Sequence, residues 1–341
     1  MTMDNVVPGP AERKVVVRSF DDIAGYEHSM RLATAKLVVR EAPNFNGWHA
    51  RIDLGRVRLN SAEYSASLSS SSTVRWPRFF FLSGNGHPAR VSGQDFDRGM
   101  INYMAENGPV SMVSHKHMAW TSIEFAPELL TTDLEALSGR SGFRFDHGAM
   151  FHPGGTAAWT RLIDVCRTAL RVGMTDAAGF DPKAAATAAA GVLIEAATGC
   201  LSHGAPEVDR AAARRHHVIL RRMIDTIEND HRTELTVASL CQAANVSAPT
   251  LHEISMNYLG VPPAHFLRCH RLTRVNALLR DAAPDSLTVA AAMSRNGIWE
   301  HDRAAVTYEA LFGQTPADTL NKVPRFAIVQ KRAEGLPRKR A

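Results

Sequence analysis

The sequence has little cysteine and no long hydrophobic run. Its four cysteines are scattered over 341 residues without a C-x-x-C pair, which argues against a disulfide scaffold and favours a reducing compartment. The most apolar stretch, residues 184–200, is rich in alanine and contains Glu195, so it predicts a buried helix rather than a membrane span. The first 14 residues carry no apolar signal-peptide core. We therefore expect a soluble cytoplasmic protein without a membrane partner.

The usual catalytic signatures are also missing. The chain contains no G-x-S-x-G, P-loop or G-x-G-x-x-G motif and no defensible pair of carboxylates. His216 and His217 are adjacent on a predicted helix and point to different faces, which argues against a shared ligand site. These absences predict a protein that is not an enzyme and that holds no cofactor.

The hydrophobic periodicity of the sequence changes near residue 127 from a strand-like to a helical pattern. Its length favours two domains, and its 45% hydrophobic and 21% charged residues are ordinary for globular proteins. After residue 127, helical periodicity predicts helices at 156–172, at 181–201, starting at Asp181-Pro182, and at 208–228. The expected fold class is therefore α+β. Before residue 127, short alternating runs predict about seven strands of a barrel or sandwich, at 36–40, 48–54, 57–68, 79–82, 100–104, 110–113 and 119–125.

The helix at 208–228 has one apolar stripe. Leu220, Met223, Ile224 and Ile227 recur at helical spacing, whereas the arginines of this segment face elsewhere. Such a stripe predicts packing on the helix's own domain, and a helix pair between two subunits is the alternative.

An internal repeat occupies residues 233–323. Leu235-Thr236-Val237 recurs as Leu287-Thr288-Val289, and G-x-x-P-x-x-x-L beginning at Gly260 recurs at Gly313. Each copy predicts a helix, a tight turn and a second helix; Thr236 and Ser247 are good N-caps in the first copy, and Gly260 suits the helix end. Two short helices with a sharp turn and an apolar inner face form a helix-turn-helix, whose second helix fits the major groove of DNA.

Between the two copies, residues 264–280 predict one continuous helix. Its length is roughly 25 Å, which suits holding two recognition helices about one turn of DNA apart, roughly 34 Å. The helix carries Arg268, Arg271 and Arg274 on its surface. These arginines are either phosphate contacts or a solvated face.

These segments resemble the AraC/XylS transcriptional regulators. The resemblance rests on LTVASLCQAANVSAPTLHEI, LGVPPAHFLRCHRLTRVNALL, TVAAAMSRNGIW and YEALFGQTPADTL, and more loosely on FDDIAG, FFFLSG and WTSIEF in the N-terminal half. It implies a cupin-like sensing or dimerisation domain at 15–205 with a helical extension, a connecting helix at 206–229 and a DNA-binding domain at 230–323. The helix-turn-helix units would lie at about 237–259 and 289–312, followed by a basic tail at 324–341.

The resemblance also implies site residues and partners. We expect a transcriptional regulator that binds double-stranded DNA, responds to a small-molecule effector, contacts RNA polymerase and forms a homodimer; a regulator without an effector is the alternative. Arg268, Arg271 and Arg274 would contact phosphates. The implied base-reading positions are Pro249, Thr250, His252 and Glu253 in the first unit and His301, Asp302, Arg303, Ala305 and Val306 in the second.

The chain departs from the family pattern at several of these positions. Glu253 stands where Arg or Gln is common, and Val306 where Arg is frequent. The usual buried aromatic of each recognition helix is replaced by Ser255 and Ala304. We expect Met256 and Trp299 to fill the space that these truncations leave.

A competing class is a metal-binding cupin-type enzyme or sensor whose helical module no longer reads DNA. His115 and His117 would share one face of a strand, as the histidines of metal-binding cupins do. Such sites need a glutamate three or four residues later, and Glu124 comes too late. We therefore expect no metal at these histidines.

Charge is concentrated at the end of the chain. Residues 230–322 contain eight cations and nine anions, whereas the segment from Arg325 to Ala341 adds six cations and one anion. We therefore predict that deleting Arg325–Ala341 weakens DNA binding uniformly and flattens its salt dependence. Binding titrations over a range of salt concentrations check this, and an unchanged slope would refute it.

Overall fold

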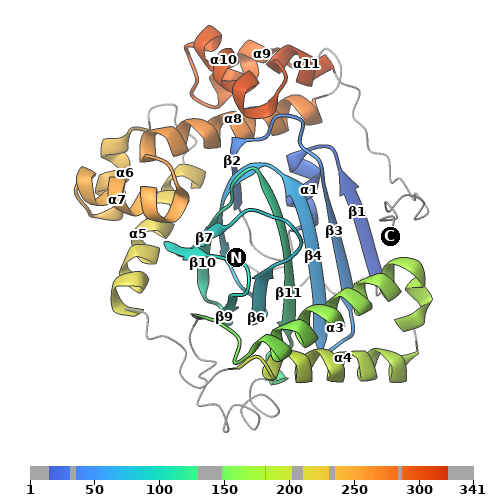
Figure 1. Ribbon diagram of the computed structural model, residues 1–341. Helices are drawn as coiled ribbons and strands as arrows, with labels where there is room; N and C mark the ends of the chain where they lie inside the picture. The colour runs from blue at the N-terminus through green and yellow to red at the C-terminus, as the bar shows by residue number, and fades with distance from the viewer. Residues whose placement is uncertain are drawn as a thin grey trace, which may run out of the picture.

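The computed structural model describes residues 15–30, 36–129, 148–180, 182–201, 210–229, 235–282 and 286–321. The predicted helix start at Asp181 and the basic tail lie outside these ranges. Strands dominate the first part and helices the second, so the expected α+β class is confirmed (Figure 1).

Two antiparallel sheets form the N-terminal part. The first has the order β1-β3-β4-β11-β6-β9-β12, and the second has the order β2-β5-β10-β7-β8. The strands are β1 (Val15–Phe20), β2 (Lys36–Glu41), β3 (Gly47–Asp53), β4 (Val57–Ser65), β5 (Ser67–Thr73), β6 (Arg78–Leu82), β7 (Ala89–Val91), β8 (Gln94–Phe96), β9 (Ile101–Met104), β10 (Pro109–Val113), β11 (His117–Phe125) and β12 (Ala149–Phe151).

All seven predicted strand segments are found, with one correction. The predicted strand 57–68 is two strands, because the chain leaves β4 of the first sheet at Ser65 and enters β5 of the second sheet at Ser67. The short strands β7, β8 and β12 and the first strand β1 were not predicted. Helix α1 (Ile23–Ser29) was also missed; Asp22 caps it by accepting a hydrogen bond from Gly25 N at 2.7 Å.

The first sheet is buried on both faces. Side chains alternate along a strand, so Phe79 enters the core beneath helices α3 (Thr156–Thr175) and α4 (Lys183–Thr198), whereas Phe80 enters the other core with Leu68 of the second sheet. A hydrogen bond of 3.0 Å from Tyr64 Oη to Ser114 Oγ also joins the two sheets. The cupin likeness stays a prediction.

The helical part begins with α5 (Arg210–Asn229). Its predicted stripe is buried, with every member at most 7% exposed, and it packs on α6 (Val237–Ala244) and α7 (Ala248–Leu259) of the same chain. The stripe therefore packs on the helices that follow it in the same chain, and its assignment to one domain stays a prediction. A short 3-10 helix, η2 (Ala177–Phe180), lies between α3 and α4. The helices after α5 are α6 (Val237–Ala244), α7 (Ala248–Leu259), α8 (Pro263–Asp281), α9 (Val289–Arg295), α10 (His301–Phe312) and α11 (Pro316–Asn321).

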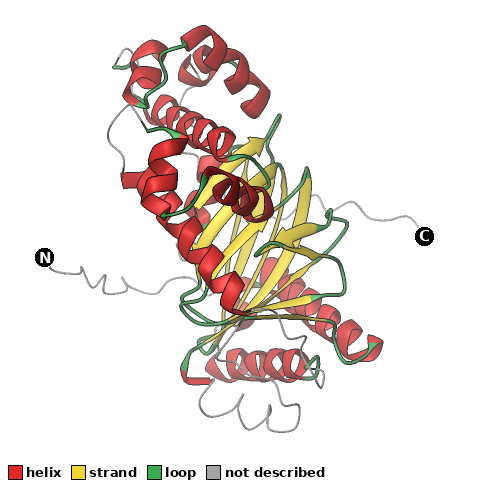
Figure 2. Cartoon of the chain, turned by 90° about the vertical axis from the view of Figure 1, so that its left-hand side faces the viewer, coloured by secondary structure: helices red, strands yellow, loops and turns green. Residues whose placement is uncertain are grey.

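The helical part lies directly against the second sheet (Figures 1 and 2). Helix α8 crosses the end of the sheet beside β2, and α7 lies beside β10. No described helix has the length and apolarity needed to span a bilayer.

His49 on β3 gives the fold a pH dependence. It is 8% exposed beside Trp120, and burial lowers its pKa to about 4, with the charges of Arg51 and Arg18 acting in the same direction. In the unfolded chain the histidine pKa is about 6.5. Below that pH the unfolded chain binds a proton at this residue, whereas folded His49 stays neutral down to about pH 4. The contribution of His49 to stability is therefore complete above about pH 6.5 and is lost as the pH falls towards 4.

We expect the free energy of unfolding to drop by about 2 kcal/mol from this group at about pH 5. Urea unfolding near neutrality and at about pH 5 checks this. The variant His49→Phe cannot titrate, and it should lose that part of the pH dependence. An equal drop in both proteins would assign the effect to other groups.

Candidate nucleic-acid interface

The first helix-turn-helix unit is α6, a turn and α7. Thr236 Oγ1 accepts from Ser239 N at 3.2 Å and Ser247 Oγ accepts from Thr250 N at 3.3 Å, so both predicted N-caps are confirmed. Asn245 makes the turn in the left-handed region, with φ 56°. Leu251 and Ile254 bury the inner face of α7. The outer face leaves the four predicted reading positions exposed: Pro249, Thr250, His252 and Glu253.

The second unit, α9 and α10, is less uniform. Asp302 and Arg303 are exposed and Val306 is 71% exposed, whereas Ala305 is half-buried. His301 is also half-buried, with Nε2 3.2 Å from Ser294 Oγ. The exposed part of this helix carries an ion pair of 3.5 Å between Arg303 and Glu300, so its surface has charges of both signs.

A buried hydrogen-bond chain fixes α10 in place. Asn276 Nδ2 of α8 donates to Tyr308 Oη at 2.6 Å, and Tyr308 Oη donates to Thr319 Oγ1 of α11 at 2.8 Å. This network was not predicted from the sequence. No spacing rule links positions on three different helices.

The arginines of α8 do not form one set. Arg268 and Arg274 are exposed. Arg271 is half-buried and donates from Nη1 to Gly297 O and from Nη2 to Leu235 O, both at 3.3 Å. It therefore joins the entrance of the first unit to the turn of the second, a role that differs from the phosphate contact expected for it.

The expected filling of the truncated positions is wrong. Met256 is 38% exposed and Trp299 is 64% exposed. A cleft of about 370 Å³ lies between α8 and α10, and Ala304 and Trp299 both line it. Ser255 is fully buried, and its hydroxyl finds a partner there because it donates to Val261 O at 2.7 Å.

The two candidate metal-binding histidines do not share a strand face. β10 ends at Val113 and β11 begins at His117, and Lys116 between them has φ 50°. His117 Nε2 lies 2.7 Å from Glu63 Oε1, whereas His115 Nδ1 faces the Arg40 guanidinium at 3.3 Å. In the described ranges no three His, Cys, Asp or Glu side chains gather as metal ligands.

Comparison with known proteins identifies the helical part. A helix-turn-helix domain family matches residues 240–322. The chain is 24% identical over 101 residues to the XylDLEGF operon transcriptional activator of Pseudomonas putida, covering 30% of this chain and 32% of that protein. A second such activator, also from Pseudomonas putida and numbered 3, is 25% identical over 101 residues. The chain thus spans about a third of the length of the curated relatives it matches.

Solved structures give a wider likeness. The AraC-like transcriptional activator CuxR covers 77% of this chain and 96% of its own, with 12% identity and a TM-score of 0.42. A probable AraC family transcriptional regulator from Rhodopseudomonas palustris covers 30% of this chain and 94% of its own, with 27% identity and a TM-score of 0.28.

The C-terminal helices therefore form a helix-turn-helix domain, and this chain is similar over 101 residues to transcriptional activators of Pseudomonas putida.

The different placement of Arg268 and Arg271 predicts different effects on stability. Arg271→Ala leaves two carbonyls without their donors, so we expect the free energy of unfolding to fall by about 1–3 kcal/mol. Arg268→Ala changes an exposed side chain and should stay within about 0.5 kcal/mol of the parent protein. Urea unfolding of both variants measures this, and equal values would contradict the role given to Arg271.

Proposed function

We propose that this protein is a sequence-specific DNA-binding transcriptional regulator. The observation that carries the proposal is that both second helices leave the outer faces of their N-terminal halves exposed, while their inner faces are buried. A recognition helix reads base edges from such a face in the major groove. The proposed reading residues of α7 are Pro249, Thr250, His252 and Glu253. Those of α10 are His301, Asp302, Arg303, Ala305 and Val306, of which Asp302, Arg303 and Val306 are the most accessible.

Phosphate contacts are proposed for Arg268 and Arg274, which are exposed on α8 between the two units. The family-implied contact at Arg271 is supported less, because its guanidinium donates to two carbonyls. Glu253 limits the first unit to bases that offer a donor, of which cytosine N4 is one.

For the N-terminal domain we propose a sensing role with a small-molecule effector, within the boundaries that the sequence predicts. Support comes from the core between the two sheets, where the buried atoms His49 Nε2 and Ser122 Oγ have no hydrogen-bond partner in the described ranges. Trp120 of β11 and Phe80 of β6, with ring centroids 5.6 Å apart, belong to the same core. A second copy of the chain and RNA polymerase are further proposed partners, and the cytoplasm is the proposed location.

Selection from a random duplex library with the full chain tests the function. We expect enriched sequences with two half-sites about one turn apart, roughly 34 Å. His252→Ala should relax the preference in one half-site and Arg303→Ala in the other, each by about 1–3 kcal/mol of discrimination. Arg268→Ala should weaken all sequences alike and reduce the salt slope by about 1.

Matched controls lie on the same two helices. Asn257→Ala and Glu309→Ala change exposed residues in the C-terminal halves of α7 and α10, one helical turn beyond the last reading positions. Their selected sequences should equal those of the parent chain. A parent chain that enriches no sequence would refute the proposed function.

A further inference from the structure

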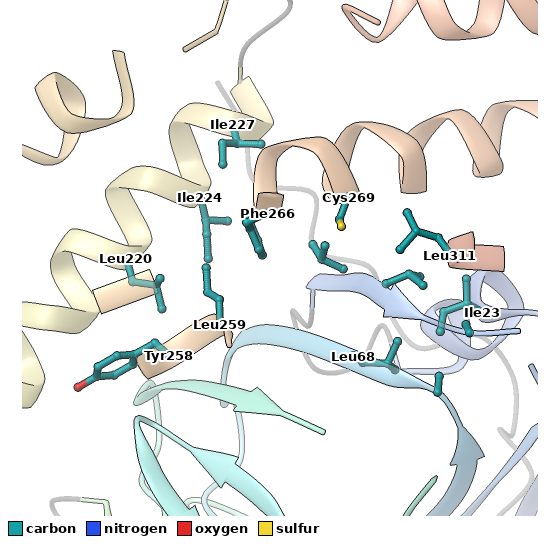
Figure 3. Close-up of a cluster of buried hydrophobic side chains, with 14 of the residues drawn as sticks. Ile23, Leu68, Leu220, Ile224, Ile227, Tyr258, Leu259, Phe266, Cys269 and Leu311 are labelled. Atoms are coloured by element: carbon teal, nitrogen blue, oxygen red, sulfur yellow. The ribbon is translucent and has the colours of Figure 1, made fainter. Parts of the chain in front are cut away.

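The C-terminal ends of both recognition helices contact the N-terminal domain. Figure 3 shows Tyr258 and Leu259 at the end of α7 and Leu311 at the end of α10 in one buried cluster with Leu68 and Ile23. The reading positions lie at the opposite, exposed ends of the same helices. Each helix has 12 residues and is about 18 Å long.

At α7, the sheet supplies a hydrogen-bond donor to the helix end. The last four carbonyls of a helix lack partners within it, and the Ser69 hydroxyl of β5 donates to one of them, Leu259 O. Gly260 follows with φ 72° and is tightly enclosed, because an added Cβ would lie 2.7 Å from Arg40 Nη1 and 2.8 Å from Val113 Cγ1.

At α10, the same arrangement recurs with a backbone donor. Ala42 N, directly after β2, donates to Leu311 O at 2.7 Å. Gly313 follows with φ 68°, and an added Cβ would lie 2.9 Å from Pro43 Cα.

Both donors lie on or next to one pair of hydrogen-bonded strands, since Ser69 is in β5 and Ala42 directly follows β2. β2 and β5 are antiparallel neighbours, with Val38 opposite Ser69 and Glu41 opposite Ser67. The distance between the C-terminal ends of α7 and α10 is thus set by the positions of the two donors, Ser69 and Ala42, at the β2–β5 pair. The ion pair of 2.7 Å from Arg280 of α8 to Asp22 adds a third link between the two parts.

We propose that the N-terminal domain positions the two recognition helices for reading by capping their C-terminal ends, with the Ser69 hydroxyl and the Ala42 N–H as positioning groups. The proposal rests on the proposed DNA-binding function. Docking leaves the accessible reading residues uncovered, so the docked arrangement is the one that reads DNA. Loss of either cap loosens one helix end and lets the two reading faces move relative to each other.

The test uses the full chain and two variants with matched controls. Ser69→Ala removes one cap, and Ser71→Ala is its control two residues further along β5. Gly313→Ala pushes the second helix end away from Pro43. Gly55→Ala is its control, because Gly55 has a similar φ of 83° with nothing within 4 Å of an added Cβ.

Hydrogen exchange is the first readout. Amides in the last turn of the affected helix should exchange roughly three- to tenfold faster in Ser69→Ala and Gly313→Ala, in line with one lost hydrogen bond. Exchange in the unaffected recognition helix and in both controls should equal that of the parent chain. Unchanged exchange at the last turns would overturn the proposal, and this readout needs no DNA.

Affinity for the duplex that the parent chain selects is the second readout. We expect both cap variants to bind it roughly two- to tenfold more weakly and to tolerate base pairs inserted between the half-sites better than the parent chain. Equal or tighter binding would show that docking does not assist reading and would overturn the proposal. If the parent chain selects no duplex, the proposed DNA-binding function is refuted. The hydrogen-exchange result still decides, separately, whether the caps hold the helix ends.

Discussion

The carbonyl groups at a helix end need hydrogen-bond partners, and this requirement organises the contact between the two parts of the protein. A recognition helix must keep its N-terminal half free, so its C-terminal end is the part that can be anchored. In α7 and α10 a left-handed glycine ends the helix, and a donor in or directly after a strand of the second sheet meets a carbonyl of the last turn. At both glycines an added Cβ would lie too close to the N-terminal domain, namely to Arg40 and Val113 of the second sheet at Gly260 and to Pro43 after β2 at Gly313. Both recognition helices are therefore anchored to the N-terminal domain by their C-terminal ends.

The strands that hold the helices also line the inner core. Side chains alternate along a strand, so Leu68 and Val39 lie next to Ser69 and Arg40 in the sequence but on the opposite face of the sheet. Leu68 and Val39 are buried in the core that the two sheets share with Trp120. A displacement of these strands by a molecule between the sheets would move the caps with them, since each strand is a single stiff element. This arrangement gives the proposed effector a direct physical route to the reading helices.

Much of the helical part could be predicted from the sequence, because its signals are local. The N-caps at Thr236 and Ser247 and the glycine ends follow from residue types at fixed positions, and the structure contains all of them. Failures arose where tertiary context decides. The sequence does not show that Trp299 stays exposed, that Arg271 holds two carbonyls, or that residues 57–68 cross from one sheet to the other. The caps from Ser69 and Ala42 were missed for the same reason, since about 190 and 270 residues separate the partners.

Two kinds of contact act at this junction, and they do different work. The apolar cluster around Phe266, Leu259 and Val38 stabilises the association, but burial of apolar surface is non-directional and does not by itself fix a rotation. Hydrogen bonds weaken steeply away from linear geometry, so the caps supply direction. Arg40 adds to this: its Nη2 donates to Ser114 O at 2.7 Å, and its positive charge lies beside the end of α7, where the helix dipole is negative. Burial lowers the pKa of Arg40. The ordinary pKa of an arginine is so high that its guanidinium is charged at neutral pH. The apolar cluster thus keeps the two parts together, while the polar groups set the angle at which the reading helices are presented.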